Sequence, residues 1–406
     1  TAQIAADAKP DDSDLPDATG MEFPTMGVSA NLQLVNMMDY DYDDPQWDIF
    51  MDQLTYEQMA KLCANGLRMT INIDAIGKPL TVDHNGPSGV TQKYSVGENG
   101  YAVQTNDPQK DIKGTCYPCN GIIAATFNDE LIREVGELIG EDAMWAGYAG
   151  LYGTGLNIHR SPYAGRVFEY YSEDGFLSGM MSAYEVKAIQ DKGVHVVMKH
   201  FALNDCEQDR IGLGVWLNEQ AAREVYLKAF QAPVEVGNAN GVMIAYTRWG
   251  AVWSGGNYGL VTGILRNEWG CDGMVITDNV LTQYVNGPDG VLAGVSIYDA
   301  MMSFVTDTLP KYKNDPVIVT AMREACHHNL YAIANSCGMN GVGADTTIKV
   351  TRPTVVTMSI IIACASTFFC LLGIVMWIIG GIKFRKTEEY KAYKDFKKSL
   401  KAAKKA

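Results

Sequence analysis

The sequence predicts an α/β fold, a TIM-type (β/α)8 barrel followed by one transmembrane helix. After about residue 120, helical stretches alternate with short apolar runs, which indicates repeated β–α units around a parallel sheet. The region between about 50 and 340 has the length of one barrel, and a long uncharged run lies near the C-terminus. An open doubly wound sheet is the alternative, although no glycine-rich phosphate fingerprint supports a dinucleotide site.

Hydrophobic periodicity places the individual elements. Thr55, with Gln58 three residues later and an apolar stripe beyond it, predicts a capped helix. Longer periodic stretches and short apolar runs follow one another along the rest of the region. We expect helices at Glu130–Ala146, Ser178–Lys192, Asn218–Val236 and Gly259–Glu268, and strands at Gly155–Arg160, Val194–Phe201, Gly241–Arg248 and Gly273–Asp278.

Charge is unevenly distributed over the 406 residues. There are 33 basic and 47 acidic residues, a formal net charge of −14, which argues against nucleic acid as a partner. Residues 1–48 hold eleven acidic residues and one lysine, which predicts an extended acidic linker. The expected order is then a barrel domain at 49–340, a juxtamembrane linker at 341–354, a transmembrane helix at 355–382 and a basic cytoplasmic tail at 383–406.

The run 355–382 contains 28 residues without a charge. About 20 apolar helical residues cross a bilayer core, and soluble helices rarely lack a polar face, so a buried core helix is the weaker alternative. Ten Lys/Arg against three Asp/Glu follow in 383–406, and basic flanks stay in the cytoplasm. We therefore expect a single-pass protein of the cell membrane, with the barrel outside and the C-terminus inside. An exported barrel needs a signal, so further protein is expected upstream of Thr1.

The basic tail has two interpretations. It could lie on anionic lipid at the inner membrane face, or it could be a solvated topology signal. The second is favoured at this stage, because lysine runs are commonly solvated.

Polar residues gather where the predicted strands end. The carboxyl ends of parallel strands meet at one mouth of a barrel, so these side chains would share a pocket. Charged donors and acceptors suit sugar hydroxyls, and two carboxyls cut a glycosidic bond without a metal or an organic cofactor. Asp278 follows the apolar VIT run, and neighbouring cations favour its charged form, so it is the expected nucleophile. The residues at these ends are Arg160, Arg166, Glu169, Glu173, Asp174, Lys199, His200, Asn204, Asp205, Glu207, Arg210, Tyr246, Arg248 and Asp278.

Six ordered motifs resemble glycoside hydrolase family 3, the β-glucosidase-like enzymes. The resemblance covers roughly residues 50–300 and implies a barrel, retaining hydrolysis and Asp278 as the nucleophile. The motifs are NGPSGV (85–90), NIHRSPYAGRVFEYYSED (157–174), KHFALN (199–204), EQDR (207–210), MIAY (243–246) and ILRNEWGCDGMVITD (264–278). The resemblance also implies which residues line the subsite for the non-reducing sugar: Arg166, Lys199, His200, Arg210 and Tyr246. Asn85 would belong to the same subsite, at a position where the family normally has an aspartate.

The sequence departs from the family pattern in several places. Asn85 lacks the charge of the usual aspartate, and Asp83 could substitute if the loop shifts. Thr247 stands where asparagine is usual, and Asn279 where tryptophan is usual. These changes put substrate identity in doubt more than the reaction class.

The second carboxyl is missing. In most of the family it is a Glu on a sandwich domain after the barrel, but only about fifteen residues separate Cys337 from Pro353. The barrel-only N-acetylglucosaminidases use a His where this sequence has Asn204. We therefore expect a permuted arrangement, in which an upstream sandwich domain of the same protein supplies the acid/base.

Some polar residues have structural interpretations that compete with a role in the site. Arg160 is expected to form an ion pair at the barrel mouth, and Glu173 and Asp174 to cap the next helix. Cys116 and Cys119 form a lone CxxC, which favours a loop disulfide or free thiols over zinc.

Aromatic residues near the motifs are interpreted mainly as core. Phe168, Tyr170 and Tyr171 are expected to be buried, whereas Trp249 and Trp253 are weaker candidates for stacking on a sugar ring.

The function predicted from these features is a membrane-anchored exo-acting glycosidase. It would release terminal β-linked glucose or a related sugar from extracellular oligosaccharides, with retention. A catalytically weakened carbohydrate-binding barrel is the alternative, and a purely structural membrane domain is disfavoured because Lys199, His200 and Asp278 are all present.

Overall fold

The structure is a computed structural model. The chain forms two compact units, Thr1–Asp345 and Thr346–Ala406. The structure describes residues 19–38, 40–90, 114–280, 284–300, 306–339 and 354–404, and the backbone of 94–96 and 102–104.

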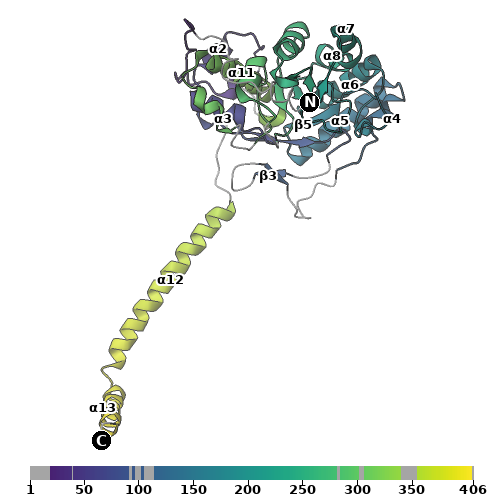
Figure 1. Cartoon of the computed structure of the whole chain (residues 1–406). Coiled ribbons are helices and arrows are strands. Elements are labelled where there is room, and N and C mark those ends of the chain that lie inside the picture. Colours follow the sequence, from purple (N-terminus) through teal and green to yellow (C-terminus); the bar gives the residue numbers. More distant parts are fainter. Residues whose placement is uncertain are drawn as a thin grey trace. The chain divides into compact units, whose positions relative to one another are not determined.

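A curled six-stranded sheet lies at the centre of the first unit (Figure 1). Neighbouring strands from β2 to β11 run parallel, and β1 is antiparallel to β2. In order, the strands are β1 (Met69–Thr70), β2 (Thr81–Asn85), β5 (Gly150–Gly155), β6 (His195–Phe201), β8 (Gly241–Ile244) and β11 (Met274–Thr277).

Main-chain hydrogen bonds close this sheet into a ring. Ile276 of β11 forms a parallel bridge with Ile297. The amide of Tyr298 donates to the carbonyl of Cys63 at 2.8 Å, and the amide of Gly66 donates to the carbonyl of Tyr298 at 2.8 Å. The segment 63–68 then leads into β1. The predicted α/β class and TIM-type barrel are confirmed, but irregular segments close the ring, so the described residues contain five regular parallel strands rather than eight.

Helices cover the outside of the sheet (Figure 1), with α5 packed on α6 and α6 on α8. Several follow the predicted ranges closely, although the stretch from Asn218 is divided by a π-helical turn, η5. The helices are α2 (Gln46–Met51), α3 (Tyr56–Ala64), α4 (Asn120–Ala124), α5 (Asp129–Ala146), α6 (Gly175–Gln190), α7 (Glu219–Ala221), η5 (Ala222–Tyr226), α8 (Lys228–Glu235), the π-helix η7 (Gly259–Glu268), α9 (Gly287–Ala293) and α11 (Pro316–Ala334).

Short elements complete the unit. Strands β7, β9 and β10 form a small sheet, and β3 pairs with β4. Their bounds are β3 (Tyr94–Val96), β4 (Ala102–Gln104), β7 (Gly214–Val215), β9 (Arg248–Trp249) and β10 (Val252–Trp253), and the 3-10 turns are η2 (Leu34–Met37), η3 (Asp74–Ile76), η4 (Val167–Glu169), η6 (Ser254–Gly256), η8 (Leu309–Tyr312) and η9 (Cys337–Met339).

Local sequence signals explain two helix starts. Thr55 accepts from the amide of Gln58, whose side chain accepts from the amide of Thr55 at 2.9 Å, so the predicted capping box of α3 is present. Asp174 accepts from the amides of Phe176 and Leu177 at 2.7 and 2.9 Å and caps α6. Asp174 is therefore a structural residue, as the sequence predicted.

The prediction of an extended linker through residue 48 is wrong for its last part. Leu34, Met37 and Trp47 are buried in the core of the first unit. The Tyr42 ring stacks on His327 of α11 at a centroid distance of 4.1 Å. The acidic residues here alternate with apolar and aromatic ones. Burial of the apolar and aromatic side chains outweighs the tendency of the acidic residues to keep the segment in solvent. Residues 1–18 lie outside the described part of the chain, and the remaining domain boundaries stay predictions.

The second unit contains two helices, α12 (Thr354–Phe384) and α13 (Glu388–Ala403). In α12, the 29 residues Val356–Phe384 are long and apolar enough to cross a membrane. Thr387 caps α13 by accepting from the amide of Tyr390 at 3.3 Å. Helical length and composition agree with the predicted span.

Candidate active site

A cleft of about 520 Å³ lies at the carboxyl ends of the parallel strands. It contains all seven residues that the sequence predicted for catalysis and sugar binding. Sequence reasoning missed Arg68 and Met243, and named Glu207 and Asn279 without a binding role. The lining residues are Arg68, Asn85, Arg166, Lys199, His200, Glu207, Arg210, Met243, Tyr246, Asp278 and Asn279.

The main chain fixes Asp278 directly beyond β11. Its amide donates to the carbonyl of Ile244 at 3.0 Å, and its carbonyl accepts from the Tyr284 hydroxyl at 2.9 Å. Oδ1 accepts from the amide of Asn279 at 2.8 Å. Oδ2 is buried and has no hydrogen-bond partner among the described residues. It is therefore an acceptor that is held in place beside the cleft with its hydrogen-bonding capacity unused.

An imidazole and a guanidinium lie near that oxygen. Oδ2 lies 3.6 Å from Nε2 of His200 and 4.0 Å from Nη1 of Arg210. Burial raises the pKa of the Asp278 carboxyl, while Arg210, Lys199 and Arg166 act in the opposite direction. The sequence predicted that the cations would favour the ionised form; they offset burial only in part.

Glutamates hold the cations of the cleft in a network of alternating charge. Arg166 donates to Glu169 and lies 3.7 Å from Glu207, while Arg210 approaches Glu207 to 2.8 Å. The Lys199 ammonium lies 3.5 Å from Glu169. Burial lowers the pKa of Lys199, and Glu169 opposes that shift. Buried charges are tolerated when they are paired in this way.

His200 is a neutral acceptor in this network. Nη1 of Arg166 lies 2.9 Å from its Nε2, and a guanidinium can only donate, so Nε2 accepts and the proton resides on Nδ1. Burial, with Arg166 and Lys199 next, lowers the pKa of His200 well below its usual range. The side chain lines the cleft, as the sequence predicted, and its Nε2 contacts Arg166 there.

Tyr246 forms one wall of the cleft. Its hydroxyl donates to the carbonyl of Asn279 at 2.6 Å, and the guanidinium of Arg210 lies 4.6 Å from its ring centroid. These contacts orient Arg210 toward Asp278. Asn279 follows Asp278, at the position where the family that the sequence resembles usually has tryptophan.

Asn85 is held by an arginine from the neighbouring segment. With its amide oriented so that the oxygen faces Arg68, that oxygen accepts from Nη1 and Nη2 at 2.8 Å. Asp83 does not replace it: that side chain is fully buried inside the barrel, where its Oδ1 lies 3.4 Å from Nε2 of His195. The idea that Asp83 substitutes for the usual aspartate is therefore wrong.

Several other predicted candidates lie outside the cleft. Arg160 donates to the Tyr226 hydroxyl at 2.8 Å, and the predicted ion pair is not found among the described residues. Trp253 is buried and donates to the carbonyl of Ala245 at 2.9 Å, so it is not a sugar platform. Trp249 is half-buried against the core.

Of the remaining predictions on aromatic residues and cysteines, some agree with the structure and one does not. Tyr170 and Tyr171 are buried as expected, but Phe168 is 61% exposed. Cys116 and Cys119 are free thiols. The described residues contain no group of three His, Cys, Asp or Glu side chains that could hold a metal.

The charge network predicts how activity depends on pH. The Arg210→Met variant should move the acidic limb of kcat/KM to higher pH, because removing a cation 4.0 Å from Oδ2 further disfavours the charged carboxylate. Arg223→Met, on the surface pair with Glu268, is the matched control. An unchanged limb in Arg210→Met would exclude Asp278 as the group titrating there.

Comparison with known families agrees with this geometry. Residues 107–291 match the family model for the glycosyl hydrolase family 3 N terminal domain. This part of the chain is similar to that domain family. The fold is that of a TIM-type barrel, as the sequence predicted.

Curated relatives of the chain are glycosidases. It is 36% identical over 236 residues to beta-glucosidase A of Butyrivibrio fibrisolvens, covering 56% of this chain and 27% of the relative. It is 35% identical over 228 residues to exo-alpha-(1->6)-L-arabinopyranosidase of Bifidobacterium longum, covering 55% of this chain and 29% of the relative. The alignments thus span less than a third of these relatives.

Solved structures show the same fold. Beta-glucosidase 3B of Thermotoga neapolitana, in complex with alpha-D-glucose, has a TM-score of 0.65 at 27% identity, covering 73% of this chain and 44% of that one. A beta-glucosidase of Bifidobacterium adolescentis has a TM-score of 0.63 at 28% identity, covering 74% and 42%.

Proposed function

We propose that this barrel supplies the nucleophile and the sugar-binding subsite of a retaining, exo-acting glycoside hydrolase. It would release terminal β-linked glucose or a related sugar from extracellular oligosaccharides or glycosides. The observation that carries the proposal is Oδ2 of Asp278, which is buried, has no hydrogen-bond partner among the described residues, and belongs to a residue that lines a cleft rich in cations.

The reaction would proceed in two displacements at the anomeric carbon. Oδ2 of Asp278 forms a bond to that carbon while the glycosidic C–O bond breaks, and the leaving oxygen takes a proton from an acid. Water, deprotonated by the same group, then cleaves the glycosyl ester from the opposite face. Two inversions give net retention. The chemistry requires two carboxyls and calls on no metal or cofactor.

The remaining lining suits recognition of one sugar ring. Arg166 and Lys199 supply charged donors, and Asn85 can both donate and accept, which suits vicinal hydroxyls. A cleft of about 520 Å³ is within the usual size of small-ligand sites. These features favour a terminal sugar over an internal chain segment.

The acid/base is proposed to come from outside this chain. Glu207 is the other carboxyl that lines the cleft, but it accepts from Arg210 and from the Asn204 amide at 2.8 Å. These partners occupy both of its oxygens, Oε2 and Oε1, so neither is free to face a leaving-group oxygen as a general acid must. A sandwich domain joined upstream would supply the missing group, and the sequence preceding Thr1 tests for it directly.

The stereochemistry of the product tests the mechanism. Proton NMR of early hydrolysis by the complete protein should show the β-anomer of the released sugar before mutarotation. Early release of the α-anomer would exclude Asp278 as a covalent nucleophile, because a single displacement inverts.

A weakened carbohydrate-binding barrel is the second candidate function. Asn85 motivates it, since an amide bonded to Arg68 lacks the charge-assisted contact of an aspartate. Calorimetry on the complete protein would then show sugar binding without any hydrolysis.

We further propose that α12 anchors the protein in the cell membrane, with the barrel outside. Cys116 and Cys206 are exposed on the first unit. A membrane-impermeant maleimide should label them in intact cells after mild reduction, and the Cys116→Ser/Cys206→Ser variant should lose that label. Labelling that requires cell lysis would contradict this topology.

A further inference from the structure

We propose that α13 lies on the surface of an anionic membrane, with its lysines against lipid phosphates. The inference rests on the proposed crossing of a membrane by α12 and is independent of the sugar chemistry. Its three supports are the distribution of side chains around α13, the lack of ion pairs at four of its lysines within the described residues, and its attachment to α12.

Apolar side chains share one side of α13. Tyr393, Phe396 and Leu400 are spaced by three and four residues, which places them on neighbouring turns of the same face. They are 54%, 61% and 48% exposed. An exposed aromatic and aliphatic face on a highly charged helix is typical of helices that lie in a membrane interface.

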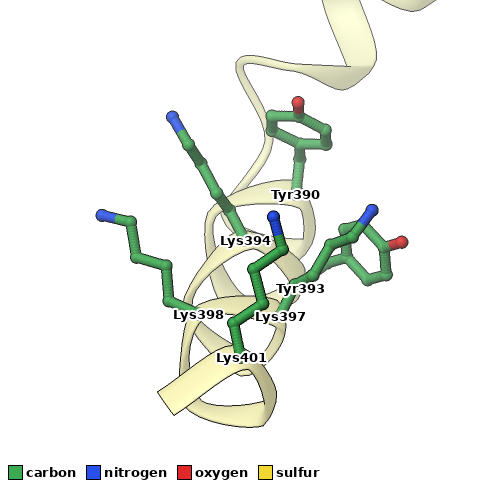
Figure 2. A pocket seen from close by; sticks show the side chains of 6 residues that line it. All are labelled: Tyr390, Tyr393, Lys394, Lys397, Lys398 and Lys401. Carbon is green, nitrogen blue, oxygen red and sulfur yellow. The ribbon is translucent and has the colours of Figure 1, made fainter. Parts of the chain in front are cut away.

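Lysines occupy the adjoining side. Lys394, Lys397, Lys398 and Lys401 project from two consecutive turns, together with Tyr390 and Tyr393 (Figure 2). Their ammonium groups make no ion pair within the described part of the chain, whereas Lys391 pairs with Glu388 at 2.8 Å. Two of the three acidic residues of α13 occupy its first turn, where they complement the helix dipole. The third, Asp395, forms no ion pair within the described part of the chain, and from Phe396 onward the helix carries lysines and no acidic residue.

The attachment to α12 places these cations at a bilayer surface. Three residues separate Phe384, the last residue of α12, from Glu388, the first of α13. The ring of Phe384 contacts that of Tyr390 at a centroid distance of 5.6 Å. If α12 crosses a bilayer, α13 begins at headgroup level, where lysines near anionic lipid bind favourably. This placement favours lipid phosphate over a soluble acidic partner.

Hydrogen exchange measured by mass spectrometry on the full chain in nanodiscs tests the proposal. In discs with a third phosphatidylserine, amides of 390–403 should exchange about tenfold or more slowly than in phosphatidylcholine discs, since each lysine near the surface contributes about fivefold in affinity. High salt should remove the difference, because it screens the surface potential.

Two matched variants separate charge from helix formation. The fourfold Lys→Gln variant at 394, 397, 398 and 401 should lose the protection, while the fourfold Lys→Arg variant should retain it. Glutamine, arginine and lysine have similar helix propensity, so the isolated helix is not the variable. Equal exchange in both lipid compositions, or protection that survives the Gln substitutions, would overturn the proposal in favour of a solvated tail or a protein contact.

Discussion

The Asp278→Ala variant of the complete protein should hydrolyse an aryl β-glucoside about 10⁴-fold or more slowly than the wild type. The loss is large because no other group occupies the position of Oδ2, which is buried and held by the backbone beyond β11. The measurement is kcat/KM with the same glucoside. Unchanged turnover would exclude Asp278 as the nucleophile.

Two controls separate loss of chemistry from loss of structure. Asp278→Asn preserves the shape of the side chain and should retain the melting temperature while losing activity. Asp174→Ala removes a helix cap, so it should lower stability modestly and leave kcat unchanged. A 2-deoxy-2-fluoro glucoside should label the wild-type protein at Asp278, detected by peptide mass spectrometry. Binding without a covalent adduct would support the weakened barrel instead.

The second large effect concerns the leaving group. Residues 1–406 alone should cleave 2,4-dinitrophenyl β-glucoside, whose leaving group departs without a proton. We expect alkyl glucosides and oligosaccharides to react about 10² to 10⁴-fold more slowly relative to the complete protein, because general acid catalysis contributes a factor of that size. Azide should accelerate turnover of the activated substrate by attacking the glycosyl ester in place of water. The measurement is a series of leaving groups compared between the two proteins.

Glu207 supplies the internal control for that experiment. Because Arg210 and Asn204 occupy its two oxygens, Glu207→Gln should disturb Arg210 and raise KM without changing the dependence on the leaving group. A flat dependence in residues 1–406 that becomes steep in Glu207→Gln would place the acid within this chain and refute the upstream assignment.

The sequence predicted the contents of the cleft better than the shape of the ring. Parallel strands deliver their terminal residues to one mouth, so the motifs at 199–204 and 243–246 were sufficient to place Lys199, His200 and Tyr246 beside Asp278. Arg68 was missed because it precedes a two-residue strand that carries no periodic signal. The contact between Arg68 and Asn85 depends on ring closure, which no local pattern encodes.

The packing of the N-terminal segment also could not be predicted from local sequence patterns. Eleven acidic residues in 1–48 indicate solvation, and composition alone cannot show that Trp47 and Leu34 find partners near α11. The acidic count and the buried aromatic residues occupy the same stretch, so a boundary based on charge was placed too late. By contrast, the apolar composition of α12 extends over its whole length, and its predicted range nearly matches the helix.

The packing of Tyr42 against α11 has a practical consequence for the design of shortened versions of this protein. Its hydroxyl donates to Glu324 at 2.6 Å, and Arg323 of the same helix binds Asp48 and Asp52. A recombinant version that begins at residue 49 would lack the segment with Tyr42 and Asp48 that packs on α11. His327 and Tyr331 of that helix would then be exposed. Fragments intended for crystallisation or calorimetry should therefore begin ahead of Leu34, or poor solubility will be mistaken for an intrinsic defect of the barrel.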